Sequence, residues 1–362
     1  MAERRELKIS VRNLVEFIFR EGDINSTGLG TRNPEAMQLG NRIHKKIQKS
    51  MGIGYQAEVP LFTYAALQSE ETGEEFDLKI EGRADGIFRD DTEILVDEIK
   101  GVFMDIHQLK EPLLVHKAQA MCYAYMICEA ENPAFITVQV TYCHLESEEI
   151  RRFPVTYRSE EIRAWFQDLI DLYTPWARYE FDWQKKRNAS IRALTFPFPY
   201  REGQKELAAC VYKTIEHKKK IFIQAPTGVG KTISTVFPTV KAMGEGLIDR
   251  LFYLTAKTIT RTVAQECFQL LSEQSLHFKY LTITAKEKMC FLEGSPDCNP
   301  ASCPYAKGHY DRVNDCVYDM LIHENDMNRD TILSYAEKHT VCPFEMCLDA
   351  ALFADSIICD YN

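Results

Sequence analysis

Residues 225–232 read APTGVGKT and follow a short, mainly apolar run at residues 221–224. This string matches the phosphate-binding loop G-x-x-x-x-G-K-[ST], with Ala225 at its first position. Such a loop joins a buried strand to the start of a helix, whose backbone N–H groups hold the phosphates. The string therefore predicts a strand over 221–224, a helix after the loop and an α/β fold for this part of the chain.

The loop residues have separate expected roles in binding ATP. Lys231 is expected to reach the β- and γ-phosphates, and Thr232 to take part in Mg²⁺ ligation. Gly228 and Gly230 allow the backbone to pass close to the phosphates. The alternative, a chance loop of small residues, does not account for the strand pattern before it and the helix pattern after it.

The net charge of −10 is unevenly distributed along the chain. Residues 51–100 hold 13 acidic and 4 basic residues, whereas residues 185–261 hold 15 basic and 5 acidic residues. The acidic block suits divalent metal chemistry and the basic block suits phosphate binding. Solvated surface would explain both blocks equally well, so charge alone does not decide the function.

The length of 362 residues indicates two or three domains. A joint is expected over 183–200, where a basic stretch containing Pro197 and Pro199 follows a long amphipathic segment, and we expect domains over 1–185 and 186–362. We expect the following elements in the first domain: helix 34–50, strands 78–88 and 92–100, helix 115–130 and strand 134–144.

Neither a membrane span nor a secretory signal is expected. No uncharged apolar run approaches the roughly 18 residues that a span needs. The start, MAERRELKIS, has no apolar core, so we expect a cytoplasmic protein.

The segment VDEIKG, residues 96–101, holds a candidate metal site. Glu98 and Lys100 lie two residues apart on a predicted strand, so both side chains leave the same face, whereas Asp97 points the other way. If the two strands pair, Asp85 lies near Glu98, and a divalent cation relieves the repulsion between the two carboxylates. Lys100 would then orient a water molecule or stabilise phosphate charge.

Three further residues join this group. His44 lies on the predicted helix 34–50, and Gln119 and Tyr123 share a helix face because they are one turn apart. Each of the three taken alone is more typical of packing or of a helix surface.

The ordered set G-x-x-x-H, G-R-A-D, E-x-K and Q-x-x-x-Y resembles the PD-(D/E)xK nucleases of the RecB-like branch over about residues 34–125. The resemblance implies that His44, Asp85 and Glu98 bind Mg²⁺ or Mn²⁺, that Asp85, Glu98 and Lys100 are catalytic, and that Gln119 and Tyr123 support the DNA or the site. Some relatives hold an iron–sulfur cluster beside this core. Three cysteines here lack that spacing and are expected to be core residues or incidental, namely Cys122, Cys128 and Cys143.

The phosphate loop and its surroundings resemble the superfamily 2 helicases. The upstream string YREGQ supplies Arg201 and Gln204, which are similar to the element that reads adenine in that superfamily. Downstream, LFYLTAKT resembles the motif that contacts the DNA backbone, which implies roles for Thr255, Lys257 and Thr258. Phosphate contacts of this kind carry no sequence information.

Seven of the 12 cysteines fall between residues 290 and 359. There is no C-x-x-C pair, so a zinc ribbon fits poorly, whereas four irregularly spaced thiolates can hold an iron–sulfur cluster. An insert at about 288–343, after the DNA-contacting motif, resembles the XPD/DinG-type iron–sulfur helicases. In these the last ligand lies in a C-P-aromatic string, like Cys342-Pro343-Phe344. The resemblance implies a [4Fe-4S] cluster on Cys290, Cys298, Cys303 and Cys342.

Cys316 is the rival for the fourth ligand position, because it is nearer in sequence to the other three. Cys347 and Cys359 fall on an apolar helix and an apolar strand and are expected in the core. These thiols therefore separate into candidate ligands and packing residues.

The final residues SIICDYN resemble the strand that carries a second Mg²⁺-binding motif, but Tyr361 stands where a glutamate is needed after Asp360. We therefore expect the chain to be the N-terminal part of a longer protein, and to bind ATP but hydrolyse it poorly by itself.

The sequence thus predicts an α/β protein, a PD-(D/E)xK nuclease domain followed by a partial RecA-like helicase domain with a cysteine-rich insert. We expect an ATP-dependent DNA helicase with a metal-dependent nuclease, acting on single-stranded or forked DNA. Two alternatives stay open. The nuclease-like domain could only bind DNA, or the chain could be a non-catalytic nucleic-acid sensor. Nothing in the sequence points to a membrane or to a particular protein partner.

Overall fold

The computed structural model describes residues 5–24, 34–226, 228–256, 258–292, 294 and 298–361. The chain divides into two compact units, which are described separately. Unit 1 comprises Met1–Glu21 and Asn25–Phe181, and unit 2 comprises Gly22–Ile24 and Asp182–Asn362. Within the described ranges, no helix is long and apolar enough to span a membrane.

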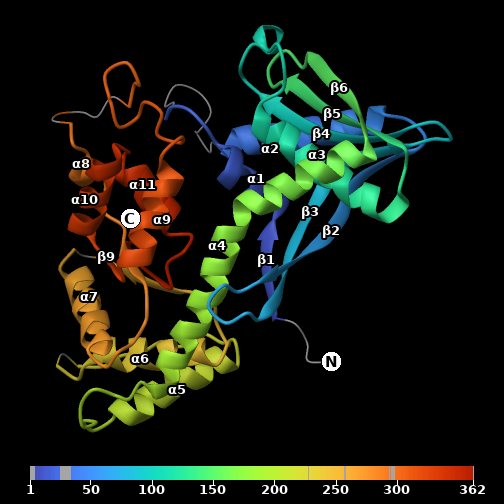
Figure 1. Ribbon diagram of the computed structural model, residues 1–362. Helices are drawn as coiled ribbons and strands as arrows, with labels where there is room; N and C mark the ends of the chain where they lie inside the picture. Colours follow the sequence, from blue (N-terminus) through green and yellow to red (C-terminus); the bar gives the residue numbers. More distant parts are fainter. Residues whose placement is uncertain are drawn as a thin grey trace. The chain divides into compact units, whose positions relative to one another are not determined.

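Unit 1 is built on one mixed sheet with helices packed against it (Figure 1). Its elements in chain order are β1 (Arg5–Ser10), α1 (Val11–Phe19), α2 (Pro34–Ser50), β2 (Tyr55–Gln68), β3 (Glu75–Arg89), β4 (Ile94–Val102), the 3-10 turn η1 (Ile106–Gln108), α3 (Leu114–Glu131), β5 (Phe135–His144), β6 (Ile150–Arg158) and the first part of α4 (Ser159–Ala193). The predicted helices and strands of this region are thereby confirmed, with small shifts at their ends.

The strand order in this sheet is β1-β3-β4-β5-β6, and β2 pairs with β3. β3 and β4 are antiparallel, with Gly86 opposite Asp97, and β4 is parallel to β5. The pairing assumed in the sequence analysis is therefore correct, and it brings residue 85 next to residue 98.

Two helices fix β4 in place. Ile43 and Ile47 of α2 pack with Ile99 in one buried cluster. α3 packs against β4 and β5, and most of its middle residues are buried, from Ala118 to Cys128. The centre of β4 is thus covered, which explains why the acidic residues Asp97 and Glu98 are almost fully buried.

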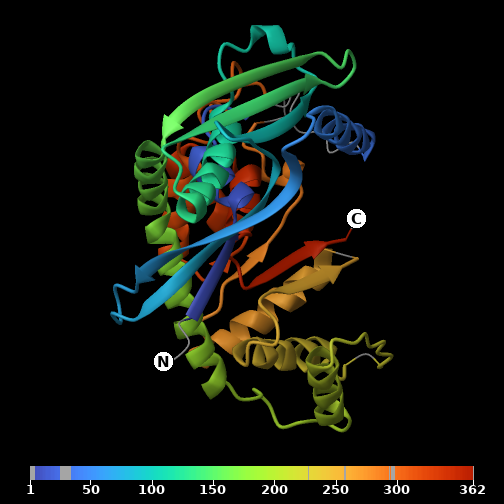
Figure 2. The same ribbon diagram turned by 90° about the vertical axis from the view of Figure 1, so that its right-hand side faces the viewer.

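Unit 2 contains a parallel sheet with strand order β7-β10-β8-β9 (Figure 2). Its elements are α5 (Gln204–Glu216), α6 (Lys231–Gly244), β7 (Leu251–Thr255), α7 (Thr258–Ser272), β8 (Tyr280–Thr282), α8 (Lys286–Met289), α9 (Val313–His323), β9 (Asp326–Met327), α10 (Arg329–His339), α11 (Pro343–Ala350) and β10 (Ser356–Asp360). The parallel strands alternate with helices, which is typical of an α/β domain.

The main core of unit 2 is formed by α6, α7 and the end of α4 against the sheet. Its centre includes Val240, Phe268, Phe278 and Ile358, which are all fully buried. Residues 183–193, which were expected to begin a joint, continue α4 as a helix. The extended joint therefore begins only after Ala193.

The predicted strand at 221–224 is wrong, because these residues have no strand geometry. Phe222 is 97% exposed, and no strand in the described part of the chain pairs with the segment. A short apolar run forms a strand only where a neighbouring strand accepts its backbone hydrogen bonds. The helix predicted after the loop is confirmed as α6.

Candidate functional site

The register of β3 and β4 places two carboxylates side by side in unit 1. The paired ladder ends at Gly86 opposite Asp97, and Asp85 and Glu98 are the next residues beyond this last pair. Asp85 Oδ2 accepts a hydrogen bond from Ile99 N at 2.7 Å, which fixes the Asp85 side chain against β4. The two acids are thus neighbours because of strand pairing, as the sequence pattern indicated.

Glu98 is buried and only half satisfied. Burial raises its pKa to about 7, against the opposing effect of Lys100, whose Nζ lies 2.7 Å from Glu98 Oε1. The other oxygen, Oε2, has no hydrogen-bond partner in the described part of the chain. A buried carboxylate oxygen without a partner is costly, and beside a second acid it is a candidate ligand for a cation.

His44 on α2 faces Asp85, and its Nδ1 lies 3.6 Å from Asp85 Oδ1. Burial works to lower the pKa of His44, but the hydrogen bond and the charge of Asp85 raise it overall. Gln48, one turn further along α2, donates from Nε2 to the backbone oxygen of Asp85 at 2.9 Å. Gln48 was not among the predicted site residues, although its i+4 spacing from His44 is a visible signal.

Gln119 and Tyr123 of α3 complete this group. Lys100 Nζ donates to Gln119 Oε1 at 3.1 Å, so Lys100 is held between Glu98 and Gln119. Tyr123 is buried and hydrogen-bonded to Gln119, and burial raises the pKa of its hydroxyl. A Cβ at Gly82 would lie 2.6 Å from the Tyr123 hydroxyl, so this glycine permits the close approach.

Asp97 belongs to a separate buried network on the opposite side of β4. Its carboxylate accepts hydrogen bonds from Thr141 Oγ1 at 2.6 Å, Gln139 Nε2 at 3.0 Å and Tyr55 Oη at 3.2 Å. Burial raises the pKa of Asp97, while these three donors act to lower it. The alternation of side chains along a strand thus separates Asp97 from Glu98.

Of the three predicted metal ligands, His44 pairs with Asp85, whereas Glu98 pairs with the predicted catalytic residue Lys100. Among the described residues, no group of three or more His, Cys, Asp or Glu side chains is arranged to hold a metal ion. The donors themselves fit a hard divalent cation, because carboxylate oxygens are its preferred ligands and Glu98 Oε2 has no hydrogen-bond partner within the described ranges.

In unit 2 the residues predicted to bind ATP converge on the loop before α6. Gln204 Nε2 donates to Val229 O at 2.7 Å, and Arg201 donates to the backbone oxygen of Gly228. Gly228 and Gly230 have φ values of 84° and 70°, which glycine adopts without strain. Two residues more than 20 positions upstream therefore hold the loop in shape.

Lys231 and Thr232 begin α6, directly after this loop. Lys231 Nζ donates to the backbone oxygens of Ala225 and Pro226 at 3.0 and 2.8 Å, and its side chain is exposed. The ammonium group therefore lies over the loop, where it can exchange these carbonyl partners for phosphate oxygens.

The residues predicted to contact DNA are only partly described. Thr255 is the last residue of β7, is buried, and donates from Oγ1 to Asp360 Oδ1 at 3.0 Å. Lys257 and the side chain of Thr258 lie outside the described residues. The structure therefore places only Thr255, and it places that hydroxyl against Asp360.

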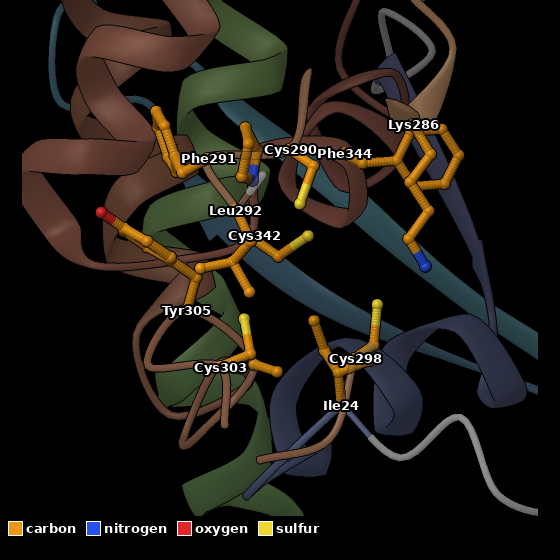
Figure 3. Close-up of a pocket in the computed structure, with 12 residues that line it drawn as sticks. Ile24, Lys286, Cys290, Phe291, Leu292, Cys298, Cys303, Tyr305, Cys342 and Phe344 are labelled. Carbon is orange, nitrogen blue, oxygen red and sulfur yellow. The ribbon is translucent and has the colours of Figure 1, made fainter. Parts of the chain in front are cut away.

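Four of the cysteines in unit 2 line one pocket (Figure 3). The sulfur atoms of Cys290, Cys298, Cys303 and Cys342 point into it from separate segments. The remaining walls are mainly apolar, with Lys286 at one side. Lys286 is hydrogen-bonded to the Cys298 thiol, and this contact raises the pKa of Lys286.

Cys342 caps the N-terminus of α11. Burial raises the pKa of its thiol, whereas the backbone N–H groups of Phe344 and Glu345 act to lower it. His309, which is buried, accepts a hydrogen bond from Cys342 N at 3.1 Å through Nδ1. Cys342 is thereby held at the pocket by His309 at its backbone N–H and by the start of α11 at its thiol.

Cys316 does not line this pocket. It is fully buried on α9, where its thiol contacts Tyr335 O at 3.4 Å and the Met346 sulfur at 3.5 Å. The cysteines expected in the core are buried in four cases and half-buried in the fifth, Cys359. The four buried ones are Cys122, Cys128, Cys143 and Cys347.

Comparisons with known proteins identify the first part of the chain. The model of the PD-(D/E)XK nuclease superfamily matches residues 14–191. A 46-residue stretch is 41% identical to the Probable ATP-dependent helicase MJ0942 of Methanocaldococcus jannaschii, and the match covers 12% of this chain and 7% of that protein. The chain thus matches only a small fraction of that relative's length.

The solved crystal structure of SSO0001 is similar at 20% identity, with a TM-score of 0.28, over 47% of this chain and 78% of that chain. The family match is the finding that bears on identity, because it spans the mixed sheet from α1 onward and includes His44, Asp85, Glu98 and Lys100. Residues 14–191 are therefore a PD-(D/E)XK nuclease domain.

Proposed function

We propose that unit 1 is a metal-dependent DNA nuclease whose centre consists of Asp85, Glu98 and Lys100. The observation that carries this proposal is the buried oxygen Glu98 Oε2, which has no partner in the described part of the chain. Glu98 lies near a second carboxylate, Asp85, and beside Lys100. A nuclease of this superfamily would need both of these residues. A merely structural glutamate in this position would be expected to have both oxygens satisfied.

Each residue then has a distinct task in cleaving a phosphodiester. Asp85, Glu98 and His44 would hold Mg²⁺ or Mn²⁺, which polarises the phosphate and lowers the pKa of water. Lys100, held by Gln119, places a positive charge where the phosphate gains negative charge. Tyr123 keeps Gln119 in position through their hydrogen bond.

We also propose that unit 2 binds ATP at the loop that leads into α6. The supporting contacts are those of Arg201 and Gln204 with the backbone of Gly228 and Val229, which organise the loop from outside. Lys231 would move from its two carbonyl partners to the phosphates, and the N–H groups at the start of α6 would face them.

A [4Fe-4S] cluster on Cys290, Cys298, Cys303 and Cys342 is proposed for the pocket in unit 2. The four sulfur atoms around one pocket support it, and a cubane cluster separates its ligands more widely than a single ion does, since each thiolate binds a different iron. The cluster would stabilise the described residues between α8 and α9, which form no helix or strand.

Together these sites favour an ATP-dependent DNA helicase with an attached nuclease, acting on single-stranded or forked DNA. The helicase-named relative is similar over a short stretch only, so the helicase activity depends mainly on the loop and cysteine sites. Unwinding and ATP hydrolysis belong to the whole protein in this proposal, and DNA cleavage belongs to unit 1.

Two measurements on the full-length protein test the proposal. Cleavage of labelled single-stranded DNA is expected with Mg²⁺ or Mn²⁺ and not with EDTA, and ATP hydrolysis is expected to increase when DNA is added. Hydrolysis without cleavage would leave a helicase whose nuclease-like unit only binds DNA. Loss of both activities, with DNA binding retained, would identify a nucleic-acid sensor.

A further inference from the structure

Three residues near the N-terminus belong to the cysteine-rich unit rather than to the nuclease unit. The segment Gly22–Ile24 is part of unit 2, although the chain on both sides of it belongs to unit 1. The nuclease family match covers residues 14–191 and thus includes this segment. Nothing in the sequence pattern of these residues indicated such a position.

Four hydrogen bonds tie the segment to residues 306–311. Ile24 N donates to Ala306 O at 2.9 Å, and Tyr310 N donates to Gly22 O at 3.0 Å. Gly22 N donates to Asp311 Oδ1 at 2.7 Å, and Gly308 N donates to Asp23 Oδ1 at 2.6 Å. Both segments contribute backbone and side-chain groups to these bonds. The four bonds therefore fix the position of Gly22–Ile24 along residues 306–311.

Gly308 has a left-handed backbone conformation and lies close to the Arg312 side chain. Its φ is +59°, and a Cβ there would lie 2.8 Å from Arg312 Nη1. Arg312 in turn donates to the backbone oxygens of His339 and Thr340, at 3.2 and 2.7 Å. The turn at residues 306–312 therefore contacts both Gly22–Ile24 and the residues that immediately precede Cys342.

Ile24 reaches the cysteine pocket itself. It is 6% exposed and packs in one buried cluster with Cys298, Cys303 and Ala306. Figure 3 shows Ile24 beside Cys298, at the end of the pocket opposite Cys290. Its apolar side chain therefore packs beside two of the four cysteines that line the pocket.

We propose that Gly22–Ile24 is a clasp that closes the cysteine pocket and controls access to Cys298 and Cys303. Retention of an iron–sulfur cluster would then depend on a segment that lies more than 260 residues before Cys290 in sequence. This statement about the cluster rests on the proposed function, whereas the statement about access to the thiols does not. Residues that hold the clasp act as positioning residues, because only the cysteines would bind iron.

Thiol reactivity in the iron-free protein tests the clasp directly. In Ile24→Ser, alkylation of Cys298 and Cys303 by iodoacetamide, followed by mass spectrometry, is expected to be about tenfold faster than in wild type, the factor that about 1.4 kcal/mol of lost docking gives. Exposed Cys210 and buried Cys316 serve as internal references whose rates stay unchanged. Equal rates at Cys298 and Cys303 in variant and wild type would refute the clasp.

Two further variants keep the result interpretable. Ile53→Ser removes the same side chain from a fully exposed position and should leave all thiol rates unchanged. If Ile24→Ser also exposes Cys316, Asp23→Ala repeats the test, since it removes one hydrogen bond and keeps Ile24. Faster alkylation of Cys298 and Cys303 in Asp23→Ala, with Cys316 unchanged, supports the clasp, and unchanged rates overturn it.

Iron release separates the clasp from the cluster. If wild type binds iron, a chelator should remove it faster from Ile24→Ser than from Ile53→Ser. If wild type binds no iron but the thiol rates differ as expected, the clasp holds and the proposed cluster is wrong. Iron that is released equally fast from both variants, with equal thiol rates, contradicts the clasp and leaves the cluster in place.

Discussion

Lys100 contacts Glu98 at 2.7 Å and Gln119 at 3.1 Å, and both contacts position it in the proposed nuclease centre. Replacing it with alanine removes the charge that would face the phosphate but leaves both carboxylates. We therefore expect Lys100→Ala to lower DNA cleavage at least about 100-fold, with Mn²⁺ binding measured by calorimetry largely retained. The exposed Lys110→Ala is the control and should cleave like wild type. Cleavage by Lys100→Ala at the wild-type rate would remove Lys100 from the site.

Lys279 is a buried lysine directly before β8. Its Nζ donates to Glu324 O at 2.6 Å and lies 4.1 Å from the Trp183 ring centre. Burial lowers its pKa from 10.5 to about 8, against the raising effect of Asp355. The unfolded chain therefore binds more protons between these two values, so this lysine makes stability rise with pH across that window.

Lys279→Met should lack this rise. The free energy of unfolding of each protein is measured with urea at pH 7 and at pH 9.5. From the lower to the higher pH, the wild type is expected to gain about 1–2 kcal/mol relative to Lys279→Met, since one pKa unit corresponds to 1.36 kcal/mol. Other groups titrate in both proteins and cancel in the difference. A difference that is the same at both pH values would show that the folded-state pKa of Lys279 is unchanged by burial.

At the scale of elements, the phosphate loop and the start of α6 together form the proposed ATP site. Lys231→Ala is expected to weaken ATP binding by about 10-fold or more, since a hydrogen bond to a charged group contributes about 1.5–3 kcal/mol. Lys219→Ala, at an exposed position before the loop, is the matched control. Calorimetric affinities that are equal for the two variants would refute the assignment of the loop.

The elements also show which parts of the structure the sequence could predict. The neighbouring positions of Asp85 and Glu98 followed from strand alternation and the pairing of two adjacent strands, which are local properties. The strand at 221–224 failed because a strand needs a partner, and local apolarity does not supply one. The docking of Gly22–Ile24 was missed because its hydrogen bonds join residues almost 290 positions apart.

At the scale of the whole molecule, four cysteines line the pocket, whereas Cys316 is packed in the core. The purified protein is expected to carry about four iron atoms per chain. Cys342→Ser should lose them, because Cys342 lines the pocket, whereas Cys316→Ser should keep them, because Cys316 is buried elsewhere on α9. Metal analysis after anaerobic purification measures this. The opposite pattern would make Cys316 the ligand, and stoichiometric zinc without iron would replace the cluster with a zinc site.

The central claim is that the carboxylate pair of unit 1 catalyses DNA cleavage. Glu98→Gln keeps the shape of the side chain but removes the charge that a divalent cation needs, so the comparison of Glu98→Gln with wild type tests this claim most directly. With Mn²⁺ and single-stranded DNA, we expect the wild type to cleave and the cleavage rate of Glu98→Gln to be lower by at least about 100-fold. Equal cleavage by both proteins, or none by wild type with either metal, would contradict it.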